Sequence, residues 1–536
     1  MRKYLYAFLL IFTIVTGFYF FLGWWQLPEG HRYIYPIDDV YIHLALARNF
    51  ADYGIWSVNT SGFDSASSSI LYTLLLTALI KVFGDWEYYP LIINVFFGYL
   101  TVYMVYRYFK ENYGEREMKW AIVLLLPFSM LYFSALLGME HTLHMFLITV
   151  AVYLIHQNVN SDFDRRDFLK MLAVVFFISV IRFESMFFTV SLALALSLRK
   201  EIWKSVLVLI TGFLPIVIFG LISVKSGGYF FPNSVMIKGS YPSDEHFLYS
   251  IWNILEKGIL LNSSFYKCLF FPFVIIVVYL INKYRKSKIT VLFKSETLII
   301  TVVSMAVLHS LFAFLKYRYE NYVMIAVLLV IIPIIADFFK GFSFKNIKVN
   351  LSDLLMIGSV TVVIMVSAYR FVYHHLPLKY SSKGINEQQI EMSRFLGEYY
   401  KGEKVLANDI GAISYFSHVQ LLDMVGLGST DIATIKINNK HHSRERYITE
   451  NKKYITDYAK EKKCGIAVIY PEWFPGSPPA NWIPVSSWTS FANYGPAISR
   501  IVFYALKPEE VAPLQRNLSK FNLDSNVKQW FYIYQK

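Results

Sequence analysis

The sequence predicts a polytopic α-helical membrane protein with a soluble α/β domain after its last transmembrane helix. Of the 536 residues, 55% are hydrophobic and 18% aromatic, and the mean hydropathy is +0.41. Apolar runs of bilayer-spanning length recur up to residue 373, where short alternating strand and helix signals replace them. This composition excludes an ordinary soluble globular protein.

The first apolar run, residues 4–25, has the roughly 20 residues that a transmembrane helix needs. Arg2 and Lys3 precede it, which favours a cytoplasmic N-terminus, and Trp24 and Trp25 close it as interfacial anchors. Because no small-residue cleavage site follows, we expect a retained helix rather than a signal peptide.

We expect about eleven transmembrane helices in total. They lie near residues 4–25, 90–108, 120–136, 141–156, 168–182, 185–198, 201–223, 266–282, 297–315, 320–336 and 352–373. The basic clusters at 107–119, 165–170, 199–204, 283–288 and 340–348 fall between spans, as cytoplasmic loops do. The formal charge of +13 therefore reflects orientation in a bacterial-type cytoplasmic (inner) membrane and does not indicate a nucleic-acid partner.

This topology places two large segments outside the cytoplasm. The first outer loop, residues 26–89, holds a helical stretch that ends near Tyr53 and an amphipathic juxtamembrane helix over 68–83. We group this loop with the spans in one transmembrane domain, residues 1–373. Residues 374–536 form the extracytoplasmic α/β domain, with expected strands at 404–407, 420–425, 465–470 and 501–506 and a helix over 443–462.

The candidate functional residues lie in the outward-facing segments. Asp38 and Asp39 follow the first span, Glu140 lies in the turn after the third, and Arg182 and Glu184 lie in the turn after the fifth. The outward-facing cations also include Lys238 and Arg318. Carboxylates can take a proton from an attacking hydroxyl, and cations can hold a phosphate through charge-assisted hydrogen bonds. Together they suit sugar transfer from a lipid-linked phosphate.

Each of these positions also has a plain structural explanation, because turns between apolar helices need polar residues. Two adjacent carboxylates repel each other, however, and a loop that only faces solvent gains nothing from that cost. We therefore favour a catalytic role for Asp38 and Asp39. His144 lies one helical turn from Glu140 and is equally well explained as a packed, hydrogen-bonded residue.

Local motifs add a family resemblance that covers almost the whole chain. Residues 38–42 (DDVYI) and 47–49 (ARN) resemble the opening of GT-C glycosyltransferases, most closely that of cell-wall arabinofuranosyltransferases. Further matching segments are 68–76 (SSILYTLLL), 138–140 (GME), 182–184 (RFE), 231–234 (FPNS) with Lys238, 409–413 (DIGAI) and 423–427 (DMVGL). Ala45 departs from the pattern where such proteins carry a second Arg, and Ile70 stands in place of a Pro.

The resemblance implies a polyprenyl-phosphate sugar donor, inverting transfer and an acidic base in the first outer loop. The sugar would be a pentofuranose such as arabinose, although donor identity is the property most exposed to the departures at Ala45 and Ile70. The acceptor would be an extracytoplasmic glycan, lipid or protein. The implied donor or phosphate contacts include Arg48 and Asn233, and the outer-domain contacts include Asp409 and Asp423.

We assign Asp38 or Asp39 as the base for the acceptor hydroxyl. Glu140 is either an acid on the acceptor side or a group that supports the residues in contact with substrate. Arg182, Lys238 and Arg318 are expected to contact the donor phosphate. The remaining candidates on the acceptor side are Glu184 and His144. The residues require no cofactor; a divalent cation held by Asp38 and Asp39 is compatible with them but not demanded by them.

Three other function classes explain the sequence less well. A flippase or other transporter of lipid-linked saccharides would place ionisable residues near the membrane midplane and show related halves with broken helices, and neither pattern is present. A glycan polymerase or ligase would use a diphosphate donor and often a large outer loop between late spans. A passive envelope scaffold would leave Asp38 and Asp39 without a role.

Overall fold

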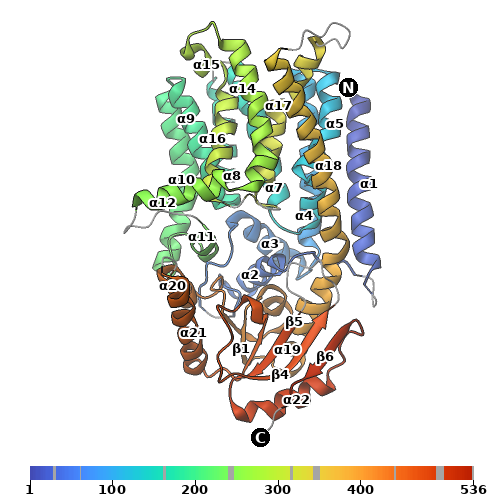
Figure 1. Ribbon diagram of the computed structural model, residues 1–536, viewed down its shortest axis with the longest axis vertical. Coiled ribbons are helices and arrows are strands. Elements are labelled where there is room, and N and C mark those ends of the chain that lie inside the picture. Colours follow the sequence, from blue (N-terminus) through green and yellow to red (C-terminus); the bar gives the residue numbers. More distant parts are fainter. Residues whose placement is uncertain are drawn as a thin grey trace. The chain divides into compact units, whose positions relative to one another are not determined.

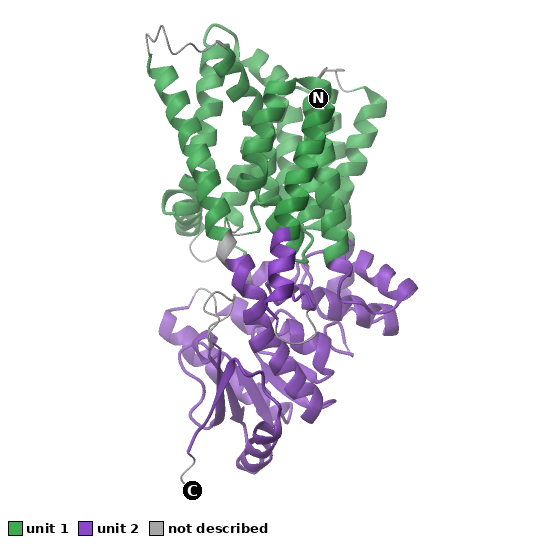
Figure 2. Cartoon of the chain, turned by 90° about the vertical axis from the view of Figure 1, so that its right-hand side faces the viewer, with its two compact units in different colours: residues 1–17, 91–218, 239–374 green, residues 18–90, 219–238, 375–536 purple. Residues whose placement is uncertain are grey.

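The computed structural model describes residues 1–27, 32–60, 62–160, 164–239, 247–313, 315, 318–341, 350–439, 442–490 and 500–533. Contacts divide the chain into two compact units, which Figure 2 colours separately. Unit 1 comprises Met1–Gly17, Leu91–Ile218 and Gly239–His374, and unit 2 comprises Phe18–Pro90, Phe219–Lys238 and His375–Lys536. The first outer loop thus shares a unit with the C-terminal residues, whereas the sequence analysis groups it with the spans.

Unit 1 is helical in its described residues, and its long helices run side by side in Figure 1. The helices that lie wholly or mainly in unit 1, long and short, are α4 (Tyr89–Asn112), α5 (Glu115–Ser129), α6 (Leu131–Leu136), α7 (His141–Asn160), α8 (Arg165–Ile181), α9 (Met186–Leu198), α12 (Phe247–Leu255), α13 (Ser263–Phe265), α14 (Phe271–Tyr284), α15 (Ile289–Ser295), α16 (Thr297–Phe312) and α17 (Asn321–Gly341). Short turns η1 (Phe183–Ser185), η2 (Glu256–Leu260) and η3 (Tyr266–Phe270) join some of them. The boundary between the units falls inside α1 (Arg2–Trp25), α10 (Ile202–Lys225) and α18 (Leu351–Ile385), and also after Pro90 near the start of α4.

Each of the eleven expected spans coincides with helix in the structure. By length and composition, seven helices among the described residues qualify as membrane spans, or eight if α15 and α16, which meet at 86°, count as one. The span expected at 120–136 is broken at Met130, which has φ 55° and separates α5 from α6. The chain is therefore an integral membrane protein, and the number eleven stays a prediction.

The centre of unit 1 is α17, which packs against α5, α7, α14 and α16. Of its most apolar window, 78% is buried, as expected for a helix that is hydrophobic on all sides and surrounded by other helices. The turns that enter α7, α9 and α17 carry the charged residues described below, so this packing brings the three turns together.

Unit 2 is built on a six-stranded sheet of order β2-β1-β3-β5-β4-β6. Strands β1 (Lys404–Ala407), β2 (Gln420–Asp423) and β3 (Ile466–Ile469) are parallel; β5 (Arg500–Ala505), β4 (Ile483–Ser490) and β6 (Val527–Phe531) continue the sheet in antiparallel pairs. The four strands expected from the sequence are present, and β4 and β6 are additional. The carboxyl ends of β1, β2 and β3 form one edge, so Asp409, Asp423 and Tyr470 follow strands at the same side of the sheet.

The helices of unit 2 come from all three of its segments. They are α2 (Asp39–Tyr53), α3 (Ile70–Phe83), α11 (Asn233–Lys238), η4 (Asn386–Ile390), α19 (Glu391–Tyr399), η5 (Ile413–Ser417), α20 (Thr430–Asn438), α21 (Arg444–Glu461), η6 (Pro471–Trp473), η7 (Pro508–Glu510) and α22 (Val511–Lys520). One hydrophobic core contains Ile42, Leu46 and Val58 of the first outer loop together with Phe395 and Trp488 of the C-terminal segment. Burial of these side chains holds the distant segments together.

Candidate active site

Asp38 is a buried carboxylate that joins the first outer loop to the loop after β1. Its Oδ2 accepts a hydrogen bond of 2.5 Å from the Gly411 amide, and its Oδ1 accepts one of 2.8 Å from the Ala412 amide. Asp409 also hydrogen-bonds to it. The sequence predicted both motifs but not this pairing, which links residues 373 positions apart.

Asp38 and Asp409 form a hydrogen-bonded pair of buried carboxyl groups. Burial and the neighbouring Asp38 carboxylate raise the pKa of Asp409 well above its usual range, and Gln389 Nε2 donates to Asp409 Oδ2 over 2.7 Å. Burial also raises the pKa of Asp38, but two backbone amides favour its charged form. We therefore place the proton on Asp409, which donates it to Asp38. Asp38 is fixed by three donors and serves to hold the loop.

Asp39 is in a different position from its neighbour. It is the first residue of α2 and is half-buried, whereas Asp38 is 6% exposed. A carboxylate in the first turn of a helix is stabilised by the helix dipole. The structure thus distinguishes the two aspartates, which the sequence could not: Asp38 holds the backbone, and Asp39 is the more accessible carboxylate.

Three of the predicted donor contacts also lie in unit 2. Arg48 donates to the carbonyl oxygens of Tyr415 and Ser414 over 2.7 and 3.3 Å, so it fastens α2 to η5. Asn233 is buried and donates to the Leu427 carbonyl over 3.2 Å. Lys238 ends α11, and its side chain lies outside the described residues.

Two further buried carboxylates hold loops in unit 2. Asp423 accepts hydrogen bonds from the amides of Val425 and Gly428 over 2.6 and 2.7 Å. Asp64, which the sequence analysis did not single out, accepts from Ser57 Oγ over 2.6 Å and from the Val58 amide over 2.8 Å. Burial raises the pKa of Asp64 to about 7. An isolated aspartate in a Ser-rich loop gives no sequence signal for such burial.

In unit 1 the predicted Glu140, Arg182 and Glu184 form one ion-pair cluster. Arg182 Nη2 and Nε reach Glu184 Oε1 and Oε2 over 2.7 and 3.1 Å, and Arg182 Nη1 donates to Glu140 Oε1. Arg182 is 2% exposed and Glu140 is fully buried. Because two carboxylates already engage its guanidinium, Arg182 is better suited to positioning these carboxylates than to holding a phosphate.

Arg318 reaches the same cluster through Tyr319. The guanidinium of Arg182 lies 5.4 Å from the centre of the Tyr319 ring, and that of Arg318 lies 5.1 Å from it. Arg318 Nη2 also donates to the Tyr319 hydroxyl over 3.3 Å. Arg318 is half-exposed, in contrast to Arg182, so it is the cation of this group that a ligand can reach.

His144 lies in a packed aromatic arrangement beside this cluster. Its Nε2 is 3.1 Å from Ser185 Oγ, and its ring stacks on Tyr322 at a centroid distance of 4.2 Å. The Tyr322 hydroxyl is in turn 2.9 Å from His309 Nδ1. The structural explanation that the sequence left open for His144 is therefore supported by its contacts.

A second buried ion pair in unit 1 escaped the sequence analysis. Arg370, in the middle of α18, contacts Glu320 Oε1 with both terminal nitrogens over 3.2 Å, and its Nη1 is 3.1 Å from Cys268 Sγ. The pair joins α18 to the start of α17. The sequence does contain a signal for such a pair, namely an arginine within an apolar run, because a charge in a transmembrane span needs a partner.

No cluster of three or more His, Cys, Asp or Glu side chains arranged to hold a metal occurs among the described residues. The divalent cation that the sequence analysis allowed at Asp38 and Asp39 stays a prediction. Two backbone amides and Asp409 already engage Asp38. Of the two aspartates, Asp39 would therefore be the main ligand of such a cation.

The fold resembles solved membrane glycosyltransferases over nearly the whole chain. ArnT from Cupriavidus metallidurans bound to undecaprenyl phosphate is 12% identical, with a TM-score of 0.54 over 95% of this chain and 99% of that chain. The oligosaccharyltransferase of Archaeoglobus fulgidus in complex with Zn and sulfate is 13% identical, with a TM-score of 0.51 over 94% of this chain and 73% of that chain.

Sequence comparisons add little to this. A family described as "Domain of unknown function (DUF8728)" matches residues 382–504, which lie in unit 2. No curated protein has a matching sequence.

The chain therefore has the GT-C fold: a bundle of apolar helices with a C-terminal sheet domain. This confirms the fold class predicted from the sequence. At 12 to 13% identity the likeness establishes the fold alone, and the resemblance to arabinofuranosyltransferases stays a prediction.

Proposed function

We propose that the chain is an integral membrane glycosyltransferase that moves a sugar from a polyprenyl-phosphate donor to an extracytoplasmic acceptor, with inversion at the anomeric carbon. The observation that carries this proposal is the GT-C fold combined with an accessible Asp39 beside an aspartate, Asp38, that is committed to the backbone. The undecaprenyl phosphate named with ArnT supports a polyprenyl-phosphate lipid as partner.

In this proposal Asp39 is the base. It takes the proton of the acceptor hydroxyl as the hydroxyl oxygen attacks the anomeric carbon from the face opposite the phosphate. The bond between the anomeric carbon and the phosphate oxygen breaks, and polyprenyl phosphate leaves with its electron pair. The sequence favours Arg318 as a cation for the leaving phosphate. Within unit 1, Arg182 positions Glu140 and Glu184.

The finer features rest on the sequence. The motifs at 38–49 and 68–76 favour a pentofuranose such as arabinose, and the basic clusters between spans favour an active site outside the cytoplasm. The acceptor is a glycan, lipid or protein on that side.

The proposal is tested with the full chain in proteoliposomes and a polyprenyl-phosphate donor carrying a radiolabelled sugar. We expect Asp39→Asn to lower transfer by about 10²- to 10⁴-fold without changing the thermal unfolding midpoint, because the loss is that of a general base. Asp52→Asn is the matched control, since Asp52 is an exposed carboxylate on the same helix, and it should leave transfer unchanged.

Three outcomes would count against the proposal. Full activity in Asp39→Asn would reject Asp39 as the base. If the unmodified protein moves the intact donor across the bilayer and never cleaves it, the protein is a transporter. If the protein consumes only a diphosphate-linked donor, it is a polymerase or ligase.

A further inference from the structure

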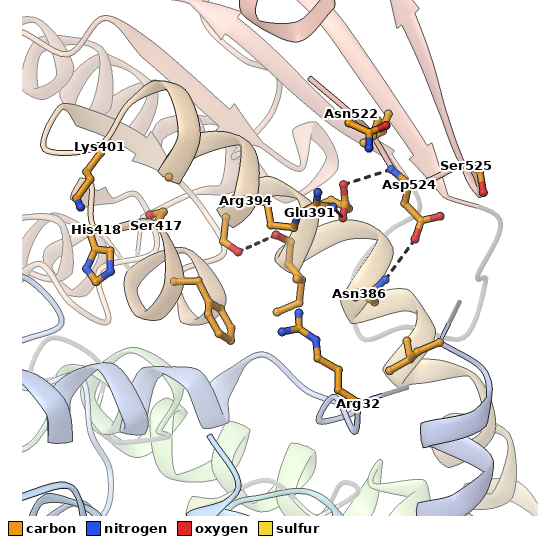
Figure 3. A pocket seen from close by; sticks show the side chains of 16 residues that line it. Arg32, Asn386, Glu391, Arg394, Lys401, Ser417, His418, Asn522, Asp524 and Ser525 are labelled. Atoms are coloured by element: carbon orange, nitrogen blue, oxygen red, sulfur yellow. Dashed lines mark hydrogen bonds and ion pairs between the residues drawn. The ribbon is translucent and has the colours of Figure 1, made fainter. Parts of the chain in front are cut away.

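Unit 2 contains a polar groove of about 760 Å³ that no step of the proposed chemistry uses (Figure 3). Its walls come from η4, α19, the end of η5, the loop 522–525 and Arg32. In Figure 3, Lys401 and His418 lie at one end, Asn522 and Ser525 at the other, and Arg394 between them.

Both acidic residues of the groove are engaged by the protein itself. Glu391 pairs with Arg394 through Oε1 and accepts the Asp524 amide through Oε2 over 3.3 Å. Asp524 accepts from Asn386 Nδ2 over 3.3 Å and from the Asn526 amide over 2.8 Å. These carboxylates hold the walls together and have little capacity left for a ligand.

The basic residues are more available than the acidic ones. The side chain of Arg394 is 50% exposed although it pairs with Glu391, and Lys401 is exposed. In the part of the chain that the structure describes, no carboxylate oxygen lies within 4.0 Å of Lys401 Nζ. Arg32 points into the groove and lies 6.0 Å from the centre of the Phe416 ring. The groove therefore presents a positive field to a ligand.

The other lining groups suit a saccharide. Hydroxyl and amide side chains, which can both donate and accept hydrogen bonds, are contributed by Ser393, Ser417, Asn386 and Asn522. Phe416 supplies an aromatic face against which the C–H face of a sugar ring can pack. Such a lining binds a hydroxyl-rich chain better than an apolar lipid tail.

The groove is connected to the proposed base through η5. The loop that enters η5 carries Gly411 and Ala412, whose amides hold Asp38, and η5 ends in the groove at Phe416 and Ser417. The ring of Tyr41, two residues after Asp39 on α2, lies 5.3 Å from that of Phe416. A ligand in the groove therefore lies next to the segment that positions α2.

We propose that this groove binds the acceptor and that the acceptor is an anionic saccharide, bearing carboxylate or phosphate groups. This inference rests on the proposed function, which it deepens by naming the acceptor class. Lys401 and Arg32 bind the anionic groups, and Phe416 with the amide and hydroxyl side chains binds the sugar rings.

The test measures binding directly, by isothermal titration of the full chain in detergent. The probes are a hexamer of galacturonic acid, an oligomer of glycerol phosphate, and maltohexaose as the neutral match. We expect at least one anionic probe to bind with an affinity about 10-fold higher than that of maltohexaose, or more. In the double variant Lys401→Gln, Arg32→Gln, the affinity for that anionic probe should be about 10-fold lower. Lys453→Gln, on the exposed surface of α21, is the control and should change nothing.

Comparison of the galacturonic acid hexamer with the glycerol phosphate oligomer identifies whether a carboxylate or a phosphate group is recognised. Equal binding of maltohexaose, or affinity for anionic probes that the double variant leaves unchanged, would overturn the inference. Cleavage of the polyprenyl-phosphate donor is followed in the same preparations. If the donor is cleaved but the groove variants do not change binding of the anionic probes, only the acceptor inference is refuted. If the donor is not cleaved, the proposed function is refuted.

Discussion

Asp38 and Asp39 are neighbours in the chain, yet their surroundings give them different roles. Asp38 accepts hydrogen bonds from two backbone amides and from Asp409. Asp39 is half-buried at the start of α2. A carboxylate with three donors has few lone pairs left for a substrate hydroxyl. The same distinction separates the two arginines of unit 1, since Arg182 is engaged by two carboxylates and Arg318 is half-exposed.

The two arginines should therefore respond differently to the same substitution. Arg182→Gln leaves Glu140 and Glu184 buried without their cation, which we expect to destabilise the protein by about 3–5 kcal/mol. Arg318→Gln should leave the unfolding midpoint almost unchanged and lower transfer on the order of 10²-fold, because it removes a donor to the leaving phosphate. Thermal unfolding and a transfer assay on each variant check this; an unstable Arg318→Gln or a stable Arg182→Gln would contradict it.

Asp64 should make the stability of unit 2 depend on pH. Burial raises the pKa of Asp64 from about 3.9 in the unfolded chain to about 7 in the folded one. Its protonated form is therefore favoured by folding, and its contribution, on the order of 4 kcal/mol, is complete below about pH 4 and lost as the pH rises through about 7. We expect the midpoint temperature of thermal unfolding to decrease as the pH is raised from about 5 to about 8.

The variant Asp64→Asn isolates this effect, because an amide stays neutral over the whole range. Its unfolding midpoint should fall less steeply with pH than that of the unmodified protein. Parallel curves for the two proteins would assign the pH dependence to the Asp38 and Asp409 pair, whose raised pKa values act in the same direction.

Among the elements, η5 and α2 depend on each other. Arg48 of α2 donates to the carbonyls of Ser414 and Tyr415, and the loop entering η5 donates its amides to Asp38. Gly411 permits this close approach, since a Cβ there would overlap the backbone oxygen and carboxylate of Asp38. The position of Asp39 therefore depends on a loop that lies far along the sequence.

Gly411→Ala should displace the start of α2 and reduce both stability and transfer. Overpacking at such a contact costs about 1–3 kcal/mol, and the displacement moves Asp39. Gly358→Ala is the control, because a Cβ at Gly358 meets nothing within 4 Å. The comparison uses unfolding midpoints and kcat; a Gly411→Ala protein that matches Gly358→Ala in both would show that the contact is not needed.

The sequence predicted elements where the local pattern is strong. Long apolar runs located the transmembrane helices, and short apolar runs located β1, β2, β3 and β5. Strand β4 was missed because Pro484 and its serines weaken the strand signal, although neighbouring strands and burial stabilise it. Helix α12 was missed because its nine residues are too short for a span.

The candidate site could be predicted as a set of residues but not as an arrangement. The types and positions of Asp38, Glu140 and Arg182 were evident from motifs and topology. Their partners were not, because the contact of Asp38 with Gly411 and that of Arg182 with Glu140 depend on tertiary packing. Nothing in the local sequence reveals which of two adjacent aspartates is hydrogen-bonded.

At the scale of the whole molecule, unit 2 gathers three separate parts of the chain, and the first and the last of them share one core. Trp488, 1% exposed, packs on Phe395, Phe503 and Phe521, and the same core includes Ile42 of α2. Loss of packing in the sheet should therefore loosen the segment that carries Asp39.

Trp488→Ala should cost about 3–5 kcal/mol and speed amide hydrogen exchange in α2 as well as in the sheet. Trp530→Ala is the matched control, because Trp530 is 63% exposed on β6. Exchange is read by mass spectrometry of peptides from residues 39–53. Faster exchange confined to the sheet in Trp488→Ala would show that the first outer loop is stable by itself.

The discontinuous make-up of unit 2 has a consequence for biosynthesis. The segment with both aspartates leaves the ribosome before residues 91–374 are made, and the strands that hold it come last. At roughly 5–20 residues per second, the interval lasts tens of seconds. During that time Asp38 lacks the amides of Gly411 and Ala412, so an incompletely translated chain carries no assembled centre. Under the proposed function, nascent or truncated copies would therefore not transfer sugar.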